Sequence, residues 1–175
     1  MKQPAELYAS TVPELIRGLE RLLHFMAVAR KHARKSKYNA DVFLTARLYP
    51  DMYTFIQQIQ YAYFTALDFT RQLTARKPPK MKYNEKTYED LIASIKKVLV
   101  YLRKLRAEDF AGAEKKTAAP YFTPKLQLPA RAHARLVTLP NFYFHVSTAY
   151  AILRHEGVPL GKKDFIGKLP KGRLK

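Results

Sequence analysis

The chain has 175 residues, of which 47% are hydrophobic and 26% charged, a balance typical of one folded domain with a sizeable core. It has no cysteine, which excludes disulfides and thiolate metal sites, and its excess of lysine and arginine gives a formal net charge of +18. The N-terminus MKQPAELYAS lacks the apolar segment of a signal peptide, and no stretch is apolar enough to span a membrane. We therefore predict a single cytoplasmic domain over residues 1–175, with a basic tail from about residue 168.

The first predicted helix begins at Ser10-Thr11, where Thr11 and Glu14 have the spacing of a capping box. Its apolar residues recur at helical spacing, and they are Val12, Leu15, Ile16, Leu19, Leu22, Leu23 and Met26. The pattern ends in the basic run ARKHARKSK, near Ser36. His24 falls on the polar side, so we expect a solvated imidazole there.

The second predicted helix runs from Pro50 to about Ala75. Proline is tolerated at a first helical position, and Asp51 in the first turn complements the helix dipole. The segment carries few charges, which indicates heavy burial. Its apolar stripe consists of Met52, Phe55, Ile56, Ile59, Tyr63 and Leu67, and a second, mixed stripe consists of Gln57, Gln60, Phe64 and Asp68.

The third predicted helix starts after Thr87 as N-cap and carries a narrow apolar seam from Leu91 to Leu105, typical of bundle packing. Residues 107–138 lack helical periodicity and contain three prolines, which forbid a long helix there. Weak alternation in KLQLPARAHARLVTL favours a short irregular hairpin, with its histidine, His133, either exposed or contacting a polyanion.

The fourth predicted helix spans about 140–156 and ends at Gly157, a residue suited to the left-handed position after a helix. Four amphipathic helices and one long connector between the third and the fourth predict an all-α four-helix bundle.

His145 lies in this last helix, within the run LPNFYFHVSTAYAILRHEGVPLGKKDFIG. Helical phase points it toward the core. Ala149 occupies the position one turn on, and His155 lies about 15 Å along the axis, too far to share a metal ion. The sequence leaves three roles open for His145: a core histidine with a hydrogen-bond partner, a residue lining a pocket, or a metal ligand.

Nucleophilic catalysis finds little support in the residues. The chain has no cysteine, no GxSxG elbow and no P-loop, and its paired carboxylates fit helix starts. We assign no catalytic residue and predict no metal and no cofactor.

The C-terminal run quoted above, together with RLYPDMYTFIQQIQYA (residues 47–62) and EKTYEDLIASI, resembles a bacterial family, the domain of unknown function numbered nineteen-ninety-three. The resemblance covers about residues 5–167 and extends to the DinB/YfiT-like superfamily of four-helix bundles. It implies an up-down-down-up bundle, often forming a homodimer. Many superfamily members hold a divalent metal through three histidines, one of them from the second helix.

This sequence departs from that pattern, because its second helix has no histidine and Ala149 stands where another ligand is expected. What the resemblance implies here is the fold and a pocket, without a reaction. The candidate pocket residues are Asp51, Gln57, Asn141, Tyr143 and His145.

The leading functional hypothesis is a homodimeric module that binds a small ligand or a partner without a metal. The alternative is a DinB-like hydrolase or transferase with a degenerate site around His145 and Asp51, which requires both side chains to face one cavity. A weaker alternative is polyanion binding through ARKHARK, ARAHAR and the basic tail.

Overall fold

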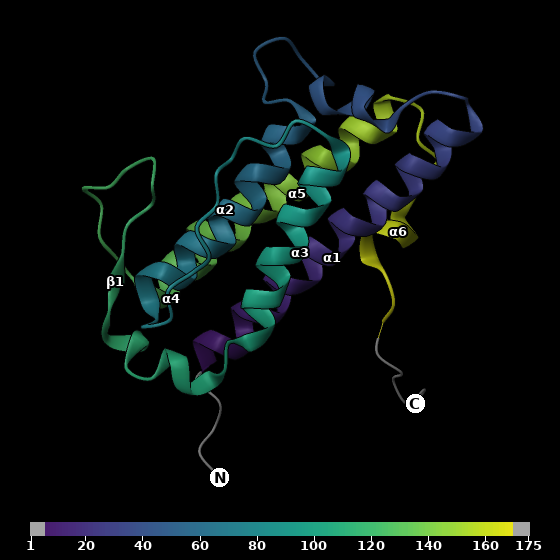
Figure 1. Cartoon of the computed structure of the whole chain (residues 1–175). Helices are drawn as coiled ribbons and strands as arrows, with labels where there is room; N and C mark the ends of the chain where they lie inside the picture. The colour runs from purple at the N-terminus through teal and green to yellow at the C-terminus, as the bar shows by residue number, and fades with distance from the viewer. Residues whose placement is uncertain (1–5, 170–175) are drawn as a thin grey trace, which may run out of the picture.

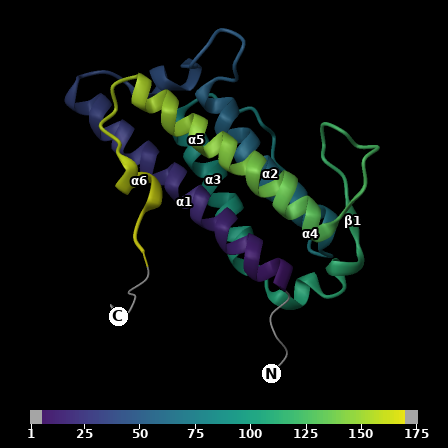
Figure 2. The same cartoon turned by 180° about the vertical axis from the view of Figure 1, so that it is seen from behind.

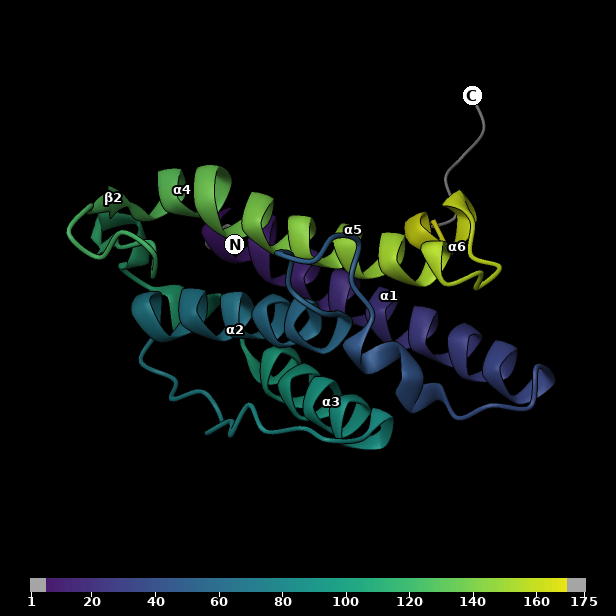
Figure 3. The same cartoon turned by 90° about the horizontal axis from the view of Figure 1, so that it is seen from above.

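The computed structural model describes residues 6–169, and four long helices form its body (Figure 1). They are α1 (Glu6–Lys35), α2 (Phe55–Leu73), α3 (Tyr88–Lys104) and α5 (Leu139–His155). Helix α5 packs against α2 and α1, and α3 packs against α1 and α2. In Figure 3, α2 lies between α3 and α5. The predicted all-α four-helix bundle is confirmed.

The chain runs up, down, down and up through these helices. The start of α3 lies near the end of α1, where the backbone N–H of Tyr88 donates to the Asp41 carboxylate at 2.7 Å. The end of α3 lies near the start of α1, where the Tyr8 hydroxyl donates to the Leu105 carbonyl at 3.3 Å. Residues 74–87 therefore travel the length of the bundle between α2 and α3 (Figure 1).

The core consists of the apolar stripes that the sequence predicts. Most of the first-helix stripe is fully buried, with Ile16 and Leu23 at its half-buried edge. The four long helices also contribute large side chains that solvent does not reach, among them Phe25, Tyr63 and Phe142. Burial of these rings supplies the main driving force for folding.

Two predicted helix starts are wrong. Helix α1 begins at Glu6, and the Thr11 hydroxyl bonds back to the Leu7 carbonyl inside the helix, so Thr11 does not cap it. Helix α2 begins at Phe55, where the side chain of Gln57 accepts a hydrogen bond from the Thr54 backbone N–H at 2.9 Å. Because this cap closes the helix start, Pro50 and Asp51 are left in an exposed turn before it.

The predicted start of α3 and the predicted end of α5 are confirmed. The Thr87 hydroxyl accepts from the Asp90 backbone N–H at 3.1 Å, and the Asp90 carboxylate accepts from the Thr87 N–H at 3.0 Å. Gly157 follows α5 in the left-handed region, at φ 81°.

The connector holds a small hairpin beside α2 (Figures 1 and 2), made of strands β1 (Thr117–Ala118) and β2 (Leu128–Pro129). Two short 3₁₀ helices, η2 (Ala107–Phe110) and η3 (Ala113–Lys115), precede it. The prediction of non-helical chain is wrong for residues 130–138, which form α4 (Ala130–His133) and the π-helix η4 (Ala134–Thr138) and continue into α5. All three prolines precede this helix, so none interrupts it.

Two short helices complete the fold. The 3₁₀ helix η1 (Ala40–Thr45) follows α1, and α6 (Lys162–Ile166) folds back against α1, as Figure 2 shows. His24 is half-buried and pairs with Asp164 of α6 at 2.7 Å, so the expectation of a solvated imidazole is wrong.

The basic tail from about residue 168 lies mainly outside the described residues, since residues 170–175 are not among them. Between residues 6 and 169, no helix combines the length and the hydropathy that crossing a membrane requires.

Candidate functional site

His145 projects from α5 toward α2 and is buried, with 3% of its surface exposed. Its Nδ1 lies 2.7 Å from the Oε1 atom of Gln58, whose amide nitrogen donates to the Tyr53 carbonyl at 3.3 Å. Because that Gln58 oxygen accepts, the proton of the neutral imidazole is assigned to Nδ1. Nε2 is then a buried acceptor without a partner among the described residues. Burial lowers the pKa of His145 to about 4, so the ring is neutral at pH 7.

Tyr61 of α2 lies against the His145 ring. The two ring centroids are 5.3 Å apart and the planes differ by 19°. Tyr53 also stacks on Tyr61, at 4.6 Å, and the two hydroxyls are 3.2 Å apart. The hydrogen bond with Tyr53, with burial as a second cause, raises the pKa of Tyr61 to about 12. His145 is thus a core residue that supports a tyrosine at the surface of α2.

The structure separates the five predicted pocket residues. Asn141 lies at the α2–α5 interface with His145, and its amide donates to the Thr65 hydroxyl at 2.8 Å. Tyr143 faces α1 instead, where its hydroxyl donates to the Glu14 carboxylate at 2.8 Å. Asp51 is exposed in the turn before α2. The prediction of one pocket formed by Asp51, Gln57, Asn141, Tyr143 and His145 is therefore not supported by the geometry, and only Gln57 lines a pocket described below.

A different pocket lies on the outer face of α2, with a volume of about 390 Å³. We call it the aromatic pocket. Gln57, Gln60, Tyr61 and Phe64 reach it from α2 because they share one face of that helix. The remaining wall comes from two segments beside α2: the chain between α2 and α3 contributes Tyr83, and the hairpin loop contributes Tyr121. Its lining residues are Gln57, Gln60, Tyr61, Phe64, Tyr83 and Tyr121.

The rings of the aromatic pocket face in several directions. Phe64 meets Tyr121 edge to face, at 5.2 Å and 87°, and meets Tyr83 at 6.2 Å and 66°. Tyr61 lies 6.0 Å from Tyr121 with the planes 29° apart. Each ring is held by neighbouring rings, so the wall is largely formed before any ligand arrives.

One carboxylate lies behind this wall. Glu85 accepts hydrogen bonds from the Gln60 amide at 2.8 Å, the Tyr63 hydroxyl at 2.8 Å and the Ser94 hydroxyl at 2.5 Å. Gln60 therefore links the pocket to the carboxylate. Its amide nitrogen is used by Glu85, which leaves its carbonyl oxygen for a ligand.

The family model described as "Domain of unknown function (DUF1993)" matches residues 7–166. The chain belongs to this family. It is also similar to a protein of known structure, a DinB family member from Shewanella denitrificans, with 34% sequence identity and a TM-score of 0.89. The match covers 97% of this chain and 96% of that one. No curated protein matches the chain.

The metal site that the DinB resemblance implies can be tested against the side chains around His145. The neighbours of its ring include the amide of Gln58 and the rings of Tyr61 and Phe144, and Ala149 is buried one turn further along α5. Within residues 6–169, no group of three or more His, Cys, Asp or Glu side chains could hold a metal ion. One imidazole among amide and phenol groups does not fit the three-histidine ligand set.

Part of the aromatic pocket has a signal in the sequence. Gln57, Gln60 and Phe64 of the mixed stripe in the second helix form its α2 wall together with Tyr61. Tyr83 and Tyr121 carry no such signal, because each comes from a non-helical segment whose position depends on the whole fold. The environment of His133 also depends on the whole fold. The sequence predicts that His133 is exposed or contacts a polyanion, but its side chain is buried, at 3% exposure, and hydrogen-bonded to Thr138 at 3.0 Å.

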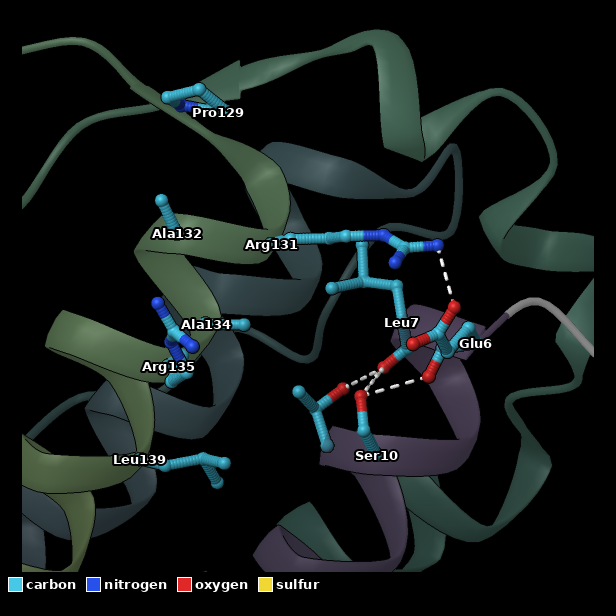
Figure 4. A pocket seen from close by; sticks show the side chains of 10 residues that line it. Glu6, Leu7, Ser10, Pro129, Arg131, Ala132, Ala134, Arg135 and Leu139 are labelled. Atoms are coloured by element: carbon cyan, nitrogen blue, oxygen red, sulfur yellow. Dashed lines mark hydrogen bonds and ion pairs between the residues drawn. The ribbon is translucent and has the colours of Figure 1, made fainter.

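A second pocket, of about 560 Å³, lies between the start of α1 and α4 (Figure 4). Its floor is aliphatic, with Leu7 and Leu139 on opposite sides. Its polar groups are largely satisfied within the chain, since Ser10 donates to the Glu6 carbonyl at 2.8 Å and Arg131 pairs with Glu6 at 2.7 Å. Arg135 also lines this pocket, but none of its lining residues is aromatic, unlike those of the aromatic pocket.

Proposed function

We propose that the protein binds a small organic molecule in the aromatic pocket, through ring and amide contacts and without a metal. The observation that supports this most is the convergence of four aromatic rings from three separate segments on one hollow of about 390 Å³. Hollows of a few hundred Å³ with mostly aromatic walls and a few polar groups are the usual form of ligand sites.

The polar groups suit a ligand that both accepts and donates hydrogen bonds. The oxygen of Gln57 is used by the cap of α2, where it accepts from Thr54 at 2.9 Å, so its amide nitrogen is the free donor. Gln60 presents the complementary acceptor, because its nitrogen is bonded to Glu85. A ligand seated against the rings would meet one donor and one acceptor at the α2 wall.

The test is a thermal-shift screen of small molecules, followed by titration calorimetry of every hit with wild type and two variants. Tyr121→Ala removes a pocket ring that is 40% exposed, and Tyr49→Ala removes an exposed ring outside the pocket. We expect Tyr121→Ala to weaken binding by about tenfold, the contribution of one aromatic contact, and Tyr49→Ala to leave it unchanged. Absence of any hit, or hits that bind both variants with wild-type affinity, would contradict the proposal.

The enzyme hypothesis gains no support from the geometry. It requires His145 and Asp51 in one cavity, but Asp51 lies in an exposed turn and His145 lines none of the five pockets described for residues 6–169.

The homodimer, the cytoplasmic location and the polyanion binding stay predictions. Tyr53 and Phe144 expose 42% and 55% of their surfaces beside the α2–α5 interface, and a second copy would cover such rings. Light scattering behind size exclusion measures the oligomeric state, and a mass of one chain at all concentrations would contradict the dimer.

A further inference from the structure

The carboxylate of Glu85 is ionised and half-buried, yet it forms no ion pair within the part of the chain that the structure describes. Its three side-chain donors, Gln60, Tyr63 and Ser94, are all neutral. None of the ion pairs among residues 6–169 involves Glu85, although the chain contains 32 lysines and arginines. A partly buried carboxylate held by neutral donors keeps its negative charge without a cation in direct contact.

Nearby lysines do not fill this role. Glu85 itself lines a second hollow, together with Lys80, Lys82, Lys86 and Lys97, and this hollow shares no lining residue with the aromatic pocket. The Lys97 ammonium donates to the Lys80 carbonyl at 2.9 Å instead of to the carboxylate. None of these four lysines pairs with Glu85 among residues 6–169, and Gln60, which donates to the carboxylate at 2.8 Å, connects it to the aromatic pocket.

The effect of this charge reaches the pocket wall. Burial acts to raise the pKa of Glu85, but the hydrogen bonds from Ser94, Gln60 and Tyr63 outweigh it, so the pKa is lowered and the group stays charged at neutral pH. Burial raises the pKa of Tyr83, and the charges of Glu85 and Asp68 raise it further. A negative field at Tyr83 favours a positive ligand beside its ring.

The backbone of Tyr83 is strained. Its φ of 52° lies in the left-handed region, which is unfavourable for a bulky aromatic residue. Stacking on Tyr63, at 5.4 Å and 22°, holds the ring in place. Strain that the surrounding contacts maintain is typical of ligand sites, and here it turns an aromatic ring toward the aromatic pocket.

We propose that the ligand of the aromatic pocket is a small organic cation with an alkylated ammonium group, recognised by the rings of Tyr61, Phe64, Tyr83 and Tyr121 and by the charge of Glu85 behind Gln60. The inference rests on the proposed function and adds the chemical class of the ligand. Rings that present their faces from different directions attract such a cation through their quadrupoles. The nearby carboxylate of Glu85, which forms no ion pair among residues 6–169, adds a longer-range attraction.

The experiment compares two probes of the same shape by titration calorimetry at low ionic strength. One is choline, and the other is its uncharged carbon analogue, in which a tert-butyl group replaces the trimethylammonium group. We expect choline to bind about tenfold more tightly, since cation–π contacts at a partly desolvated site are worth about that factor. Equal affinity, or tighter binding of the neutral probe, would overturn the inference.

Two charge variants locate the effect. Glu85→Gln should weaken choline binding by about tenfold and leave the neutral probe unchanged, whereas Glu89→Gln, which removes an exposed carboxylate of α3, should change neither. Circular dichroism of Glu85→Gln checks that its fold is retained. Equal choline affinity in wild type and Glu85→Gln would show that the Glu85 carboxylate does not contribute to binding of the cation.

The results also separate this inference from the proposed function. If neither probe binds at millimolar concentrations, the inference of a cationic ligand is wrong. Hits from the screen whose binding depends on Tyr121 would still support ligand binding in the aromatic pocket. If nothing in the screen depends on Tyr121 and choline does not bind, both fail.

Discussion

His145 is a buried, titratable side chain with only one of its two ring nitrogens hydrogen-bonded among the described residues. Its Nδ1 is satisfied by Gln58, while its Nε2 has no partner among the described residues. A buried acceptor without a partner costs free energy, which stacking against Tyr61 helps to offset. Since Tyr61 also lines the aromatic pocket, we interpret His145 as a positioning residue that fixes this ring.

The depressed pKa of His145 makes stability depend on pH. The unfolded chain binds a proton here near pH 6.5, whereas the folded chain binds it only near the pKa of about 4. Stability contributed by the neutral ring is therefore complete above pH 6.5 and is lost as pH falls from there to 4. The difference corresponds to about 3 kcal/mol. We expect His145→Gln, which cannot titrate, to have a shallower decline of the free energy of unfolding over that window, measured by urea denaturation.

The control for this measurement is His155→Gln, which replaces an exposed imidazole beyond the core. Its pH profile should follow that of wild type. Burial lowers the pKa of His133 as well, but that contribution is the same in all three proteins and cancels. Parallel curves for wild type and His145→Gln would show that His145 does not titrate differently in the folded state.

The sequence predicts the direction of the His145 side chain but not the residues that it contacts. Helical phase is a local property, so the inward direction of His145 follows from the sequence. Its partner Gln58 does not, because pairing across α2 and α5 depends on how the two helices are rotated about their axes. The positions of Tyr83 and Tyr121 are even harder to predict from the sequence. Both lie in loops, and the position of a loop depends on tertiary packing that leaves no periodic pattern in the sequence.

Helices α1 and α5 approach each other closely where Gly18 faces Phe142. A methyl group added at Gly18 would overlap the Phe142 ring, which is fully buried and has no room to move. The glycine is present because the neighbouring helix approaches its backbone, although glycine costs about 1 kcal/mol of helix propensity.

We expect Gly18→Ala to destabilise the protein by about 1–3 kcal/mol, the usual cost of overpacking a core, despite the higher helix propensity of alanine. Chemical denaturation measures the change. The control is Gly161→Ala, because Gly161 has an extended φ of −138° and the nearest atom to an added Cβ is 3.9 Å away. A double variant with Phe142→Leu should recover part of the loss, and a Gly18→Ala protein as stable as wild type would show that the helices can separate freely.

Elements also differ in how far the sequence determines them. Helix α3 was predicted correctly at its start because Thr87 and Asp90 cap each other within four residues. The predicted start of α2 is wrong because Pro50 and Thr54 are both residues typical of a helix start. Only the hydrogen bond that Gln57 accepts from the Thr54 backbone N–H distinguishes them. The helix over 130–138 follows the last connector proline, Pro129, and prolines that precede a segment do not exclude a helix within it.

For the whole molecule, the net charge of +18 is the dominant electrostatic property. The observed ion pairs engage arginines and one histidine, such as Arg30 with Glu89 at 2.9 Å and Arg103 with Glu20 at 2.7 Å. Lysines form none of the ion pairs among residues 6–169, so their charges repel one another across a compact surface. Repulsion of this kind favours the unfolded chain, in which the charges are further apart.

Salt should therefore stabilise the protein. Raising the ionic strength from about 0.01 M to about 0.15 M shortens the Debye length from about 30 Å to about 8 Å, which screens repulsion between distant lysines. If this recovers about 1 kcal/mol, the melting temperature should rise by about 2–4 °C for a chain of this size. A triple variant, Lys31→Gln, Lys96→Gln and Lys125→Gln, removes three exposed charges and should show a smaller rise. A melting temperature that falls with salt would mean that screening of the arginine ion pairs outweighs relief of the repulsion.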